Sequence, residues 1–112
     1  MADGAQAESR AADYLIEQGL TLVERNFRCR GGEIDLIMRD GAYLVFIEVR
    51  QRTHSRFGGA LESIDARKQR KLMTAAQLYL ARYTRLPPCR FDVVLIEGKT
   101  AALQWLRNAF SG

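Results

Sequence analysis

The sequence predicts a single-domain sandwich of helices and a mixed β-sheet, of the α/β or α+β class. Its 112 residues suffice to bury one hydrophobic core and are too few for two. Its apolar periodicity indicates a helix, three strands, a helix and two strands, an order typical of helices packed on a sheet. No apolar run approaches the ~20 residues needed to cross a bilayer, and the first ten residues lack a signal-peptide pattern. We therefore expect a cytoplasmic protein without membrane contact.

Residues 5–18 form the first predicted helix, and a glycine ends it. Glu8 falls within the apolar stripe of this helix. It is either a glutamate at the edge of the stripe with its head in water, or an acid directed over the sheet, and helical spacing leaves both open. Residues 20–27 are the first predicted strand, followed by a basic stretch that includes Arg30. The helical stripe consists of Ala5, Glu8, Ala12, Leu15 and Ile16.

Residues 32–50 are predicted to form an antiparallel β-hairpin. Asp40 and Gly41 are typical of a two-residue turn between paired strands. Counting outward from that turn gives a register in which side chains on one face alternate with those on the other. The predicted pairs are Arg39 with Ala42, Ile37 with Leu44, Asp35 with Phe46, and Glu33 with Glu48.

This register makes Asp35 and Glu48 diagonal neighbours on one face, with backbones roughly 7 to 8 Å apart. Arg50 follows on the same face. The usual interpretation of a charged hairpin face is a ribbon exposed to water. This face also carries apolar residues and so is expected to be covered, and buried carboxylates need a cation or dense hydrogen bonding. We therefore favour a site for a hard divalent ion such as Mg²⁺. The apolar residues are Ile37, Leu44 and Phe46.

Residues 51–63 are polar, contain glycines and are predicted to form a loop beside the hairpin. Arg52 and Arg56 would lie near a bound phosphate, although basic residues in an exposed loop often serve only solubility. Residues 64–83 are the second predicted helix, with Lys68 at the N-terminal end of its packing stripe. Three further cations either meet a phosphate backbone near the positive end of the helix dipole or form a solvated basic turn. They are Arg67, Arg70 and Lys71.

Residues 90–97 and 100–106 are the last two predicted strands. Asp92 interrupts the first of them, either as a solvent-facing cap or as a polar group near the site. Trp105 and Phe110 are candidates for exposed apolar residues or for parts of the core.

The rest of the composition limits the chemistry. Cys29 and Cys89 do not form a paired motif, and His54 is the sole histidine, which excludes the usual zinc and iron–sulfur frameworks. The chain has fourteen arginines but only three lysines. Because guanidinium groups match phosphate oxygens, this balance favours a polyanionic partner.

Several motifs together carry a family resemblance: GEIDLI at residues 32–37, FIEVR at 46–50, RFDV at 90–93, and Glu8, Phe57-Gly58 and Lys68. With them, the chain resembles the YraN family of small bacterial proteins over residues 4–110. That family belongs by fold to the PD-(D/E)XK restriction-endonuclease-like superfamily and is similar to archaeal Holliday-junction resolvases.

The resemblance implies a restriction-endonuclease-like three-layer sandwich, with a mixed central sheet of about five strands flanked by helices. It also implies that Asp35 and Glu48 bind Mg²⁺ or Mn²⁺, with Glu8 completing the metal site. The superfamily lysine falls on Arg50, which is a departure. Arginine keeps its proton at any working pH, so it can stabilise charge but cannot act as a base. Either Arg50 clamps the phosphate, or Lys68 supplies an ammonium group from the second helix.

Three functions compete at this point. The first is a metal-dependent DNA endonuclease. The resemblance to resolvases implies that it acts on branched DNA and forms a homodimer. Its catalytic site would consist of Glu8, Asp35, Glu48, Arg50 and Lys68. The second is a non-catalytic nucleic-acid-binding module on the same fold, which the Arg50 departure favours. The third is a protein-interaction subunit with a basic face. The expected nucleic-acid contacts are Arg30, Arg52, Arg56, Arg67, Arg70 and Lys71.

Overall fold

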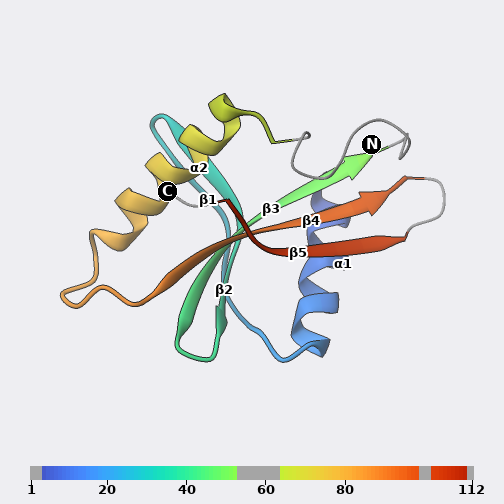
Figure 1. Ribbon diagram of the computed structural model, residues 1–112, viewed down its shortest axis with the longest axis horizontal. Helices are drawn as coiled ribbons and strands as arrows, with labels where there is room; N and C mark the ends of the chain where they lie inside the picture. Colours follow the sequence, from blue (N-terminus) through green and yellow to red (C-terminus); the bar gives the residue numbers. More distant parts are fainter. Residues whose placement is uncertain (1–3, 53–63, 99–101, 111–112) are drawn as a thin grey trace.

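The computed structural model describes residues 4–52, 64–98 and 102–110, which form two helices and one five-stranded sheet (Figure 1). The predicted order of elements is confirmed. The strands lie in sequence order, with β3 and β4 parallel and the other neighbours antiparallel. The elements are α1 (Gly4–Glu17), β1 (Thr21–Cys29), β2 (Gly32–Asp40), β3 (Tyr43–Arg52), α2 (Ala66–Leu80), β4 (Cys89–Glu97) and β5 (Leu103–Phe110).

The two helices cover opposite faces of the sheet, which makes three layers and confirms the α/β class (Figure 1). Parallel neighbours need a crossover connection, and α2 lies between β3 and β4 in the chain. On the α1 side, Leu15 packs with Leu36 and Ile47. On the α2 side, Leu72 packs with Phe46. The alternation of β3 side chains therefore supplies both hydrophobic layers.

The predicted register of the β2–β3 hairpin is wrong. Its two-residue loop is Gly41-Ala42, and Asp40 stays in the ladder opposite Tyr43. Gly41 has φ +61°, the conformation that such tight turns require at their first central position. Ile37 consequently pairs with Phe46, not with Leu44.

At Asn26 of β1 and Asp35 of β2, a shared kink changes which side chains of each strand point to the α1 face of the sheet and which point to the α2 face. Asn26 has φ +55°, a left-handed conformation that asparagine tolerates better than most residues. On β2, Ile34 packs on the α2 side whereas Leu36 packs on the α1 side, although residues two apart normally share a face. Asp35 therefore lies at the point where the side-chain alternation of β2 is interrupted.

Asp92 is not the solvent-facing cap that was one of the two alternatives for it. It is buried, and its carboxylate accepts hydrogen bonds from Arg90, from Trp105 Nε1 at 2.9 Å and from the backbone N–H of Asn108 at 2.9 Å. Trp105 also packs against the α1-side core. Phe110 stacks on an aromatic ring of β4 and is likewise a packing residue.

Candidate functional site

Four carboxylates line one hollow, and three of them come from three different elements. Glu8 comes from α1, Asp35 from β2 and Glu48 from β3. The hollow has a volume of about 240 Å³, and Glu33 and Lys68 also line it. The structure thus brings together the three acids that the sequence analysis placed at one site.

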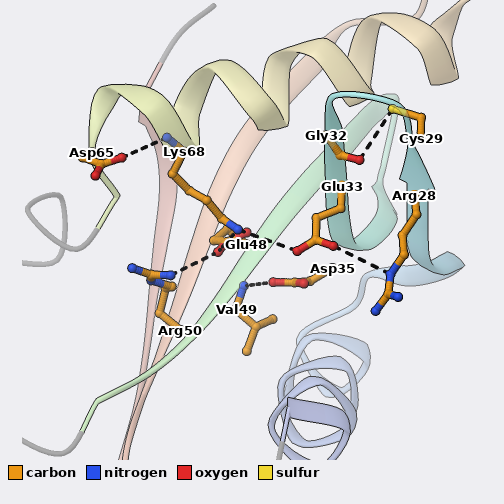
Figure 2. A network of polar contacts seen from close by, with 10 residues as sticks. All are labelled: Arg28, Cys29, Gly32, Glu33, Asp35, Glu48, Val49, Arg50, Asp65 and Lys68. Carbon is orange, nitrogen blue, oxygen red and sulfur yellow. Dashed lines mark hydrogen bonds and ion pairs between the residues drawn. The ribbon is translucent and has the colours of Figure 1, made fainter.

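Asp35 links the kinked strand β2 to β3. Its Oδ2 accepts a hydrogen bond of 2.8 Å from the backbone N–H of Val49, the residue after Glu48 (Figure 2). The Asp35 side chain therefore spans the gap between the strands and holds its negative charge beside Glu48. Burial, and after it this negative charge, raises the pKa of Glu48.

Glu48 is an almost completely buried acid, with 3% of its side chain exposed. Its Oε2 lies 3.4 Å from Nζ of Lys68 and 3.8 Å from Nη1 of Arg50. Its Oε1 is buried and has no hydrogen-bond partner among the residues described. Burial and the nearby Asp35 raise the pKa of Glu48 to about 7, while the two cations act in the opposite direction.

Glu8 also points into the protein, so its predicted alternative as a solvent-exposed edge residue is wrong. Its side chain is 13% exposed and lies 3.8 Å from Arg25, and its Oε1 is buried with no hydrogen-bond partner in the described ranges. Burial, then Asp35, raises the pKa of Glu8. Arg25 also donates to Ser9 Oγ at 3.0 Å and to the carbonyl of Ala5 at 3.4 Å, which fastens α1 to β1.

The donors of this hollow fit a hard divalent cation. Buried carboxylates with raised pKa values, each with one oxygen that lacks a hydrogen-bond partner in the described residues, gain stability from added positive charge, and Mg²⁺ prefers oxygen ligands. Within residues 4–52, 64–98 and 102–110, no three acid, histidine or cysteine side chains are already arranged as a metal-binding cluster. An ion would therefore use one or two carboxylates, as Mg²⁺ commonly does, or draw the third in by side-chain rotation.

Lys68 extends from the first turn of α2 back over the sheet (Figure 2). Asp65 caps the helix by accepting a 2.9 Å hydrogen bond from the backbone N–H of Lys68. The ammonium group lies between two acids, 3.4 Å from Glu48 and 3.8 Å from Glu33. The position of Lys68 in the helical stripe predicted this direction.

Two basic hollows adjoin the carboxylates along α2. One, of about 180 Å³, is lined by Arg50, Arg67, Lys68 and Lys71 together with the helix-capping aspartate. The other, of about 280 Å³, shares both lysines and reaches the β1–β2 turn. These cations form a continuous basic wall on the α2 side.

Two of the remaining predicted contacts have side chains that the structure describes. Arg30 and Arg70 are exposed and line neither of the two basic hollows. Arg56, His54 and the Phe57-Gly58 motif lie outside the described residues, as does the side chain of Arg52.

Glu33, Arg25 and Asn26 are site residues that the sequence analysis did not select. Glu33 lies within the GEIDLI motif, so the motif itself contained a signal. Arg25 contributes by holding α1, and Asn26 contributes by its left-handed backbone conformation. No local sequence pattern predicts either role.

The fold and the hollow define an α/β protein with an acidic site beside a basic wall. A family model described as "Uncharacterised protein family UPF0102" matches residues 7–96, and the chain belongs to that family. This confirms the YraN-like resemblance. No described helix has both the length and the apolar character needed to cross a membrane.

Relatives named "UPF0102 protein" match nearly the whole chain. One from Janthinobacterium sp. (strain Marseille) is 56% identical over 106 residues, covering 95% of this chain and 85% of that protein. One from Pseudomonas putida is 54% identical over 112 residues, covering 96% and 91%. One from Stutzerimonas stutzeri is 54% identical over 111 residues, covering 96% and 92%. These names give the family and state no activity.

Proposed function

We propose that the protein is a metal-dependent DNA endonuclease. The observation that carries this proposal is the convergence of Glu8, Asp35 and Glu48 with Lys68 around one hollow. Two buried carboxylate oxygens in that hollow have no hydrogen-bond partner in the described part of the chain. Acids held in this way favour a divalent cation, and an adjoining basic wall favours a phosphate substrate.

Asp35 and Glu48 would hold Mg²⁺ or Mn²⁺, with Glu8 as the third acid. When bound, such an ion acidifies water and neutralises charge on the scissile phosphate. Lys68 then donates hydrogen bonds to a phosphate oxygen and stabilises the negative charge that develops there. Its ammonium group already lies within 3.4 Å of Glu48.

Arg50 stands where the superfamily has its lysine, and we assign it a supporting role. Its Nη1 lies 3.8 Å from Glu48, so its guanidinium can clamp a phosphate beside the acids. It stays protonated and cannot accept a proton. Lys68 therefore takes the place of the superfamily lysine, from a helix and not from the strand.

The substrate backbone would follow the α2 side of the site. Arg67 and Lys71 lie about one helical turn apart on that side, and both line the basic hollow. Such contacts bind phosphates without reading base sequence. A branched DNA substrate and a homodimer are proposals that follow from the resolvase likeness.

The second candidate is a nucleic-acid-binding module without catalysis. Arg50 favours it, because arginine at the superfamily lysine position retains charge but loses the capacity for proton transfer. This module would bind DNA in a salt-dependent way without Mg²⁺ and would leave every DNA intact.

A cleavage assay on the purified full chain separates the two candidates. Duplex, single-stranded, flap and four-way-junction DNA are incubated with Mg²⁺ or Mn²⁺. The endonuclease cleaves at least one of them, and Asp35→Ala and Glu48→Ala abolish cleavage while retaining DNA binding. Glu24→Ala, which removes a strand acid outside the hollow, is the control. Salt-sensitive binding with no cleavage of any substrate contradicts the endonuclease and supports the module.

Metal binding has a readout independent of activity. Mg²⁺ or Mn²⁺ should raise the melting temperature of the wild type, because a ligand of the folded state stabilises it. The increase should be lost in Asp35→Ala and retained in Glu24→Ala. Equal stabilisation of all three proteins would place the ion elsewhere.

A further inference from the structure

We propose that Glu33 is a positioning residue that keeps the Lys68 ammonium group over the site when a divalent cation binds. The inference rests on the proposed function and extends it to a residue that neither the sequence analysis nor the resemblance assigned. Glu33 lines the acidic hollow and also the basic hollow that reaches the β1–β2 turn. It thus stands at the boundary between the metal ligands and the phosphate wall.

Two acids of the described residues lie within ion-pair distance of the Lys68 ammonium group. Its Nζ lies 3.4 Å from Oε2 of Glu48 and 3.8 Å from Oε2 of Glu33 (Figure 2). The other oxygen of Glu33 lies 3.7 Å from Nε of Arg28, so cations flank this carboxylate on both sides. Without a metal ion, Glu48 is the closer and more deeply buried partner of the lysine.

A divalent cation on Glu48 changes this balance. The charge of a bound cation would offset the attraction between Glu48 and Lys68 and would repel the ammonium group. Among the described residues, two acids lie within 4 Å of Lys68, and Glu33 would then remain as the one that is not needed as a metal ligand. Glu33 therefore keeps the ammonium group near the phosphate position at the stage when catalysis needs it.

The backbone segments that carry Glu33 and Lys68 are in direct contact. A Cβ at the preceding Gly32 would collide with the carbonyl oxygen of Lys71 and lie 3.2 Å from the backbone nitrogen of Ala75. The β1–β2 turn is thus in direct contact with the α2 backbone, an approach that only glycine permits. Glu33 therefore follows a residue that is packed against the α2 backbone.

Glu24 is a matched control for substitutions of Glu33. It also lies on the β1–β2 ribbon and pairs with a cation in the region of α2, Arg82, at 3.9 Å. Its side chain is 40% exposed, compared with 46% for Glu33, but it lines none of the three hollows around the site. Glu24→Gln therefore makes the same chemical change at a similar surface position.

Steady-state cleavage kinetics, with a DNA substrate that the wild type cleaves, test the positioning role of Glu33. Glu33→Gln should lower kcat roughly 10- to 100-fold, the usual cost of losing an orienting partner. KM should change by less than about twofold, since the lost interaction acts in the transition state. Glu24→Gln should match the wild type. In a Lys68→Met background, Glu33→Gln should have no further effect, because its influence passes through Lys68. An additional loss in that background would overturn the inference.

A second measurement needs no turnover. The chain has three lysines, so isotopically labelled lysine gives few NMR signals, and Lys68→Met identifies one of them. Bound Mn²⁺ should broaden the Lys68 side-chain signal strongly in the wild type and in Glu24→Gln, and clearly less in Glu33→Gln. Equal broadening in all three overturns the role of Glu33. No broadening of any lysine signal in the wild type instead overturns the proposed metal site, and with it the basis of this inference.

Discussion

Nζ of Lys68 lies 3.4 Å from Oε2 of Glu48, so a cation from the first turn of α2 meets a buried acid from the middle of the sheet. The acid on its own is costly, because burial and the neighbouring Asp35 both disfavour its charge. The ammonium group offsets part of that cost. The same pair lies at the centre of the proposed catalytic site, and stability and function are therefore linked there.

Replacing Lys68 with methionine should lower stability as well as cleavage. Glu48 would lose its nearest cation, and an uncompensated buried charge costs on the order of 1–3 kcal/mol. The loss should be visible in urea denaturation at pH 8. Lys71→Met removes the same charge one turn further along α2, at an exposed position, and should change stability by less than about 0.5 kcal/mol. Equal losses in both variants would contradict the pairing.

Glu48 should make the metal-free protein less stable as the pH rises. Its pKa is 4.5 in an unfolded chain and about 7 in the folded protein, so the folded state holds the proton more tightly. Its stabilising contribution is complete below pH 4.5 and is lost as the pH rises through 7. Glu48→Gln stays neutral, so in EDTA its melting temperature should exceed that of the wild type increasingly from pH 5 to pH 8. A difference that shrinks over this range would refute the assignment.

Gly32→Ala should destabilise the contact between the β1–β2 turn and α2. The added Cβ would collide with the carbonyl oxygen of Lys71, and the forced shift should cost about 1–3 kcal/mol. Gly4→Ala is the matched control, because a Cβ there meets nothing within 4 Å. Calorimetry should show a lower melting temperature for Gly32→Ala and an unchanged or slightly higher one for Gly4→Ala.

Asp92→Asn should be among the most destabilising single polar changes in the molecule. The buried carboxylate accepts hydrogen bonds from Arg90, Trp105 and Asn108. In asparagine one oxygen is replaced by an NH₂ group, which is itself a donor and cannot accept from these N–H groups. We expect a loss of about 2–4 kcal/mol, measured by the fluorescence of Trp105 during unfolding. Asp40→Asn removes the other, half-buried partner of Arg90 and should cost less than about 1 kcal/mol.

The convergence of Asp35 and Glu48 followed from the sequence, although the register used to predict it was wrong. The register moved by an even number of positions, so the predicted face of Glu48 and Arg50 was preserved. The Asp-Gly pair indicated a turn but not which residue occupies its first central position. The order of helices and strands along the chain was predictable because apolar residues recur with a different period in each type of element.

The other features of the site depend on contacts between distant segments. The kink at Asn26 requires a left-handed backbone angle that tertiary packing selects, and its neighbour Arg25 finds its partners on α1. The burial of Asp92 could not be inferred from its strand, because its partners come from both β4 and β5. The ends of α2 and β5 also differ from prediction: α2 ends at Leu80, and β5 runs on to Phe110.

The parallel pairing of β3 with β4 has a consequence for how the molecule forms. Leu44 pairs with Cys89, and the chain between them must close a large loop before this contact exists. During synthesis the three acids leave the ribosome well before β4, the strand that shields one edge of Glu48. The edge of β3 that carries Glu48 therefore stays hydrated in the nascent chain until β4 pairs with it, so the burial of this acid follows the long-range contact and does not precede it.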